Sequence, residues 1–119
     1  MSGLLRYNEN MSLPDILKSK DIALFCKRWK IREFAVFGSV LRDDFKPESD
    51  VDVLVSFHQS AEWGLFDHVQ MRNELETLFG RKVDLVTRRA LEQTQNQILR
   101  ESILNSVKVI FSGDEAAYA

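Results

Sequence analysis

The sequence predicts an α/β fold in which helices flank a mixed sheet of about four strands. Segments with helical spacing of apolar residues alternate with short strand-like segments, and 119 residues provide material for one core. Hydrophobic residues make up 45% of the chain and charged residues 29%, as in ordinary soluble domains. We divide the chain into a polar, flexible arm at 1–12, a single domain at 13–112 and a tail at 113–119.

The first half of the domain is expected to contain one helix and two strands. Apolar side chains recur at helical spacing over about 21–29, and the apolar run at 31–37 indicates a strand. That strand ends at Gly38-Ser39, where a short helical turn begins. The charged stretch 43–49 contains a proline and predicts a loop. Alternating valines at 51–57 predict the second strand.

The second half of the domain repeats this alternation. Helical spacing predicts a helix over 64–79, and Gly80 is placed to end it. The segment 82–87 is expected to form a third strand, and 107–111 a fourth. Between these two strands we predict one long helix over 90–105, with an apolar face formed by Leu91, Ile98, Leu99, Ile103 and Leu104.

Charge and composition exclude several classes of protein. The formal net charge is −2, so the chain lacks the basic surplus with which proteins grip nucleic acids. No apolar run approaches the roughly 18 residues needed to span a bilayer, and the first ten residues do not resemble a signal peptide. The cytoplasm is therefore the expected location. One cysteine, Cys26, and two histidines make a zinc site improbable, and Cys26 is expected to be a buried structural thiol.

Two acidic residues open the second strand. Asp50 and Asp52 are two positions apart, so on a strand their carboxylates project from the same face, with backbones about 6–7 Å apart. Like charges this close repel unless a cation lies between them. Mg²⁺ takes oxygen ligands and is usually shared with substrate phosphates, so it is the natural candidate. Taken alone, Asp-x-Asp equally fits a solvated strand end.

A third carboxylate, Asp84, lies among apolar neighbours on the third strand. If this strand lies beside the second, Asp84 joins Asp50 and Asp52. Three carboxylates suit a two-metal site, in which the ions clamp the attacking and leaving oxygens of an in-line displacement. Asp84 would then lie nearest the incoming hydroxyl, as a metal ligand, a general base or both.

The turn after the first strand is suited to phosphate. Gly38 allows a ligand to approach the backbone closely, and Ser39 adds a hydroxyl donor. Arg42 follows Ser39 by three residues, so both lie on the same helical face, and its guanidinium can hold phosphate oxygens in a bidentate way. Each signal alone is common in proteins, but their order along the chain makes coincidence unlikely.

These motifs resemble the signature of the polymerase-β-like nucleotidyltransferase superfamily. The resemblance is carried by Phe37-Gly38-Ser39-Val40-Leu41-Arg42 and by Ser49-Asp50-Val51-Asp52-Val53-Leu54-Val55. The span from about 31 to 111 is similar to the minimal nucleotidyltransferases called MNT antitoxins, whose third-strand pattern matches Arg81-Lys82-Val83-Asp84-Leu85-Val86-Thr87. Many superfamily members have a glycine after the arginine, whereas this chain has Asp43.

The resemblance implies a function and a partner. Asp50, Asp52 and Asp84 would bind two Mg²⁺ ions, and Gly38, Ser39 and Arg42 would hold the phosphates of ATP. Family members of this size pair with a HEPN-domain toxin and neutralise it by binding. Active members also transfer AMP from ATP to a tyrosine of the toxin.

Two other functions remain open at this point. The chain could neutralise a toxin by binding alone, and an exposed apolar group at Trp63, Leu65 and Phe66 would favour this role. Core packing is the expected role of these three residues. Nucleotidyl transfer to a small molecule is the other alternative, but it needs an acceptor pocket that usually comes from a second domain.

Overall fold

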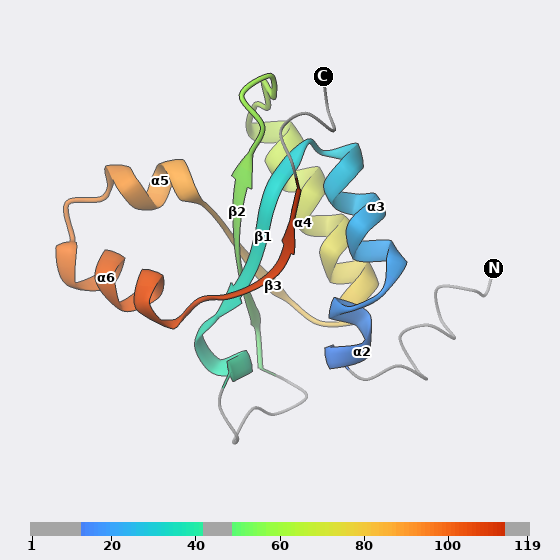
Figure 1. Cartoon of the computed structure of the whole chain (residues 1–119), viewed down its shortest axis with the longest axis horizontal. Helices are drawn as coiled ribbons and strands as arrows, with labels where there is room; N and C mark the ends of the chain where they lie inside the picture. The colour runs from blue at the N-terminus through green and yellow to red at the C-terminus, as the bar shows by residue number, and fades with distance from the viewer. Residues whose placement is uncertain (1–12, 42–48, 114–119) are drawn as a thin grey trace.

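Four strands form one mixed sheet with the order β3-β2-β1-β4 (Figure 1). The computed structural model describes residues 13–41 and 49–113. The central strand β1 (Ile31–Phe37) runs antiparallel to both neighbours, β2 (Val51–Phe57) and β4 (Lys108–Ser112). The edge strand β3 (Val83–Thr87) runs parallel to β2. The predicted mixed α/β sheet is therefore confirmed.

A layer of three helices covers one face of this sheet. They are α2 (Leu13–Leu17), α3 (Lys20–Arg28) and α4 (Leu65–Phe79), which lie together on the right of the sheet in Figure 1. Alternate residues of the strands point toward this layer and form the main core with apolar residues of the helices. The strands contribute Phe34, Val36, Val51, Val53, Val55, Val83 and Leu85, and the helices contribute Ile16, Ile22, Phe25, Met71 and Leu75 among others.

The opposite face of the sheet is partly covered by two further helices. These are α5 (Arg88–Gln93) and α6 (Gln97–Ser106), seen on the left in Figure 1. A smaller core forms beneath them from Ala35, Phe37, Leu54 and Leu91. The remaining strand positions on this face are thus free to carry polar groups.

The prediction of a single long helix over 90–105 is wrong, because the helix is interrupted at 94–96. Asn96 caps α6 by accepting a hydrogen bond from the backbone N–H of Leu99 at 3.0 Å, and the carbonyl of Thr94 accepts one from Arg100 at 2.9 Å. Thr and Asn side chains compete with the backbone for hydrogen bonds, so they favour helix ends over helix interiors. The break turns Ile98, an expected core residue, toward solvent with 83% of its surface exposed.

Most other element boundaries agree with the sequence. The strands at 31–37 and 51–57 have the predicted limits, and α4 ends at Gly80, whose φ of 71° only glycine adopts easily. Helix α2 was not predicted. The arm at 1–12 lies outside the described residues, as does the tail beyond Gly113. Within the part of the chain that the structure describes, no helix is long and apolar enough to cross a membrane.

Candidate active site

The parallel pairing of β2 with β3 brings two of the predicted carboxylates side by side. Asp52 and Asp84 are direct partners in the register of the two strands, whose backbones lie about 4.8 Å apart in such a pair. Both residues occupy the alternate positions that face away from the main core, on the same face as Leu54 and Leu91. Asp84 is exposed and Asp52 is half-buried, so both carboxylates are reachable from solvent.

Asp50 lies directly before β2, at the same end of the sheet. The backbone N–H of the next residue, Val51, donates to the carbonyl of Lys82 at 2.9 Å, which fixes the start of the parallel pair. Asp50 is two residues before Asp52, and its side chain is exposed. Its role as a metal ligand stays a prediction.

Gly38 lies against Asp52 because Phe37 and Asp52 are partners across β1 and β2. The φ of Gly38 is 74°, and a Cβ atom at this position would lie 2.3 Å from Oδ2 of Asp52. Any other residue would therefore displace the carboxylate as well as strain the backbone. This contact gives a physical reason for glycine at the position where the sequence predicted a close approach of backbone and ligand.

The rest of the predicted phosphate turn is described only in part. Gly38 begins η1 (Gly38–Leu41), a 3₁₀ turn that includes the backbone of Ser39, so the short helical turn expected after the strand is present. Arg42 lies outside the described residues. The grouping of Gly38, Ser39 and Arg42 around phosphate thus stays a prediction.

A cavity of about 450 Å³ opens beside these groups. Gly38 and Asp84 line it together with Val86 and Ala90. Its other wall comes largely from one face of α6, through Leu99, Ser102, Ile103 and Ser106. A group bound in this cavity would therefore touch both apolar side chains and the Asp84 carboxylate. The α6 residues were not predicted as site residues, although their spacing of three, four and seven positions marks one helical face.

The carboxylates fit a magnesium site that is completed by substrate. Among residues 13–41 and 49–113, no three His, Cys, Asp or Glu side chains are grouped as a ready-made metal centre. Magnesium, however, is commonly bound by one or two carboxylates together with waters and substrate phosphates, rather than by a cage of protein ligands. The adjacent, accessible Asp52 and Asp84 satisfy that requirement.

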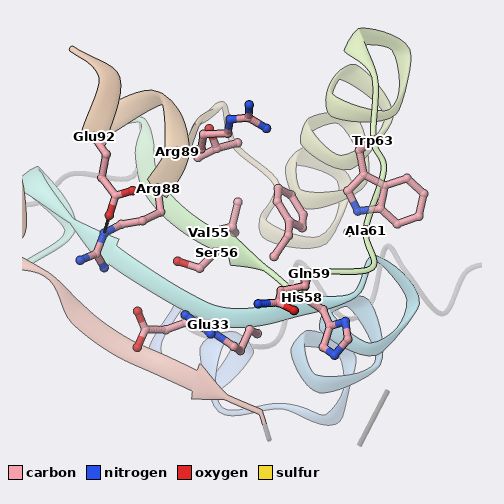
Figure 2. A pocket seen from close by; sticks show the side chains of 13 residues that line it. Glu33, Val55, Ser56, His58, Gln59, Ala61, Trp63, Arg88, Arg89 and Glu92 are labelled. Atoms are coloured by element: carbon pink, nitrogen blue, oxygen red, sulfur yellow. Dashed lines mark hydrogen bonds and ion pairs between the residues drawn. The ribbon is translucent and has the colours of Figure 1, made fainter. Parts of the chain in front are cut away.

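A second hollow, of about 670 Å³, lies at the other end of β2 (Figure 2). Arg88 and Arg89 line this hollow and not the cavity beside Asp84. Arg88 is paired with Glu92 at 3.2 Å, as the dashed line in Figure 2 marks. His58 also lines the hollow, and its ring interacts with the hydroxyl of Ser60 at 2.8 Å. These residues are thus set apart from the paired carboxylates.

Cys26 takes no part in the site. It is completely buried on α3 within the main core, as predicted, and burial raises the pKa of its thiol far above the usual range. The thiolate is the reactive form of cysteine, so Cys26 is a structural residue.

Three comparisons with known proteins agree with this geometry. A family model described as "nucleotidyltransferase domain" matches residues 19–110. Protein adenylyltransferase MntA of Thermococcus cleftensis is 37% identical over 78 residues, which are 65% of this chain and 77% of that protein. A protein of Methanocaldococcus jannaschii, provisionally named protein adenylyltransferase MJ1217, is 31% identical over 91 residues, covering 76% of this chain and 87% of its own length.

Solved structures share the fold. One, provisionally described as a minimal nucleotidyltransferase, is 33% identical with a TM-score of 0.57 and covers 75% of this chain and 85% of its own. A toxin–antitoxin crystal structure with AMP-PNP shares 18% identity with a TM-score of 0.61, covering 84% of this chain and 79% of that chain. The mixed four-stranded sheet with flanking helices is therefore that of the minimal nucleotidyltransferases. The chain belongs to the nucleotidyltransferase domain family, as the resemblance of its motifs predicted.

Proposed function

We propose that this chain is a Mg²⁺-dependent protein adenylyltransferase and the antitoxin of a HEPN-domain toxin. The observation that supports this most directly is the register pair of Asp52 and Asp84 beside Gly38. Two of the relatives are named protein adenylyltransferases. A further structure of the same fold, at 18% identity, contains a tri-AMPylated HEPN toxin of Shewanella oneidensis in complex with an MNT antitoxin.

The proposed reaction transfers AMP from ATP to a tyrosine hydroxyl of the toxin. The tyrosine oxygen forms a bond with the α-phosphorus, the bond from that phosphorus to the bridging oxygen breaks, and pyrophosphate leaves. Asp84, on the exposed edge strand, accepts the hydroxyl proton as it leaves. The cytoplasm, where ATP is available, remains the expected location.

Asp50, Asp52 and Asp84 would hold two Mg²⁺ ions in this proposal. When bound, these ions supply positive charge that neutralises the phosphates and stabilises the charge developing in the displacement. Half-buried Asp52 lies between Gly38 and Asp84, so it is placed to hold an ion that both the nucleotide and the acceptor approach. The phosphates of ATP that leave as pyrophosphate would be held by Gly38, Ser39 and Arg42.

A transfer assay tests the proposal. The purified chain, ATP labelled on the α-phosphate, Mg²⁺ and the HEPN protein encoded beside it should give labelled toxin, with the label on tyrosine by mass spectrometry. Asp52→Asn and Asp84→Asn should each lower the rate by about a hundred-fold or more, because each removes a charge needed at the displacement. Asp21→Asn, the same change on α3 in the opposite layer, is the matched control and should retain full activity. No label with the wild type, or equal labelling by Asp52→Asn, refutes the proposal.

Magnesium dependence needs a separate measurement. Chelation of divalent cations by EDTA should abolish transfer, and added Mg²⁺ should restore it. Calorimetric titration in the presence of AMP-PNP should give two Mg²⁺ per chain, and loss of Asp52 should lower this number. Unchanged transfer in EDTA would contradict the proposed cofactor.

Neutralisation by binding alone is the second candidate. It is favoured by Leu65 and Phe66, which were expected in the core but are 76% and 89% exposed at the start of α4. Trp63 does pack against the core, through a ring contact with Trp29 at 5.1 Å. A variant lacking all three carboxylates should still rescue cells from the toxin if binding suffices, and should fail to rescue them if transfer is required.

A further inference from the structure

Exposed apolar side chains gather at the starts of two helices. Leu65 and Phe66 open α4, and Ile98 and Leu99 lie in the first turn of α6, with Ile98 83% exposed. Burying large apolar side chains stabilises an interface, so clusters of exposed apolar side chains mark contact surfaces.

Two adjoining cavities at the edge strand β3 lie between these helix starts, and we refer to them together as the groove. A cavity of about 530 Å³ is lined by Leu65, Trp63 and Leu85, and also by Val86 and Ala90. Val86 and Ala90 line the cavity beside Asp84 as well, and Leu99 forms part of that cavity's far wall. The apolar surface therefore runs from α4, across β3 and past Asp84, to α6.

The edge of β3 is open within the described part of the sheet, because β3 pairs there with β2 alone. An open edge strand bordered by apolar side chains readily accepts a polypeptide segment. The groove also passes the carboxylate at which an acceptor hydroxyl must arrive. A protein substrate satisfies both features at once, since one segment can dock on apolar side chains and present its hydroxyl to Asp84.

We propose that the protein acceptor docks along this groove. Its apolar side chains also contact Phe66, next to the lining residue Leu65, at one end and Ile98, next to the lining residue Leu99, at the other. The proposal rests on the proposed function for the identity of its occupant, the HEPN toxin. It adds the surface by which the toxin is held and the direction in which its tyrosine approaches Asp84. The groove thus selects the acceptor, whereas the carboxylates and the Gly38 turn bind the nucleotide.

Binding measurements with the purified HEPN protein as the probe test this surface. The double variant Leu65→Ser/Phe66→Ser and the single variant Ile98→Ser should each raise the dissociation constant for the toxin by about ten-fold or more. Leu24→Ser is the matched control: Leu24 is 61% exposed on α3, outside the groove. It should change the constant less than two-fold. AMP-PNP affinity and thermal stability, measured on every variant, should match those of the wild type because all four side chains are on the surface.

The outcomes separate this proposal from the proposed function. If the wild type labels the toxin but the groove variants bind it as tightly as the wild type, the docking surface is refuted and the transferase stands. If the groove variants lose binding while the wild type transfers no label, the docking surface stands and the transferase is refuted. Self-association of the wild type that the double variant abolishes, with toxin binding retained, would assign the groove to a second copy of the chain and overturn the proposal.

Discussion

The backbone of Gly38 lies so close to the carboxylate of Asp52 that no larger side chain fits between them. Gly38→Ala should lower the rate of AMP transfer by about a hundred-fold, because a displacement of about 1 Å at a reacting group has that effect. Gly80→Ala is the matched control, since Gly80 has nearly the same φ of 71° but lies at the end of α4. Both variants should lose at least about 1 kcal/mol of stability, because a Cβ atom is strained at positive φ, whereas only Gly38→Ala should lose transfer. Equal rates for the two variants would contradict this view of the contact.

Cys26 provides a second prediction at the residue scale. Its thiol is buried in the main core and its pKa is raised, so the native protein at neutral pH should react with a maleimide far more slowly than a denatured sample. Mass spectrometry of the labelled chain measures this ratio. The sign follows from the pKa: raising the pH toward 9 should accelerate labelling of the denatured chain while the folded chain stays slow. Rapid labelling of the folded protein would show that α3 opens readily.

At the element scale, the strands were the most predictable parts of the chain. The limits of β1 and β2 agree with the sequence because their valine- and phenylalanine-rich runs end abruptly at glycine and charged residues. The helix expected over 90–105 failed for a physical reason. Leu91 and Ile98 are seven positions apart, which fits one helical face, so the polar residues between them did not end the predicted helix. The break depends on the side-chain hydrogen bond of Asn96, which apolar spacing does not register. Helix α2, only five residues long, is too short to show a helical period.

The cap of α6 gives a test of that explanation. Asn96→Ala removes the acceptor for the backbone N–H of Leu99 and should lower stability by about 1 kcal/mol. Because α6 forms a wall of the cavity beside Asp84, transfer activity should fall as well. Asn96→Asp and Asn96→Ser, which keep an accepting oxygen, should restore most of the stability. Urea denaturation followed by circular dichroism measures the change, and wild-type stability in Asn96→Ala would contradict the assignment.

At the scale of the whole molecule, one long-range arrangement carries the site and could not be read from the sequence. All three acidic residues could be identified from the sequence, but the order of the strands decides which of their carboxylates lie close together. Asp52 and Asp84 are 32 positions apart (84 − 52) and are paired only because α4 carries the chain across to place β3 parallel beside β2. Asp50 and Asp52, in contrast, were placed by local alternation alone.

The main core that holds this arrangement should respond strongly to cavities. Leu75 on α4 is completely buried between the helices and the sheet, so Leu75→Ala should lower the free energy of unfolding by about 2–5 kcal/mol. Leu24→Ala, at a largely exposed position on α3, should change it by no more than about 0.5 kcal/mol. Guanidinium denaturation of both variants tests whether the helical layer and the sheet unfold as one unit. A separate transition for Leu75→Ala would show that they do not.

The alternation of β3 has a consequence for how such chains can vary. Val83 points into the main core and Asp84 points to the other face, so successive side chains of this strand alternate between the two faces of the sheet. One residue inserted between Lys82 and Asp84 would turn the carboxylate toward the helices and push an apolar neighbour into solvent. Insertions in the loop after β2 carry no such penalty. Among related chains, insertions and deletions should therefore accumulate in the loops. Inside this strand they should be absent or should involve two residues at a time.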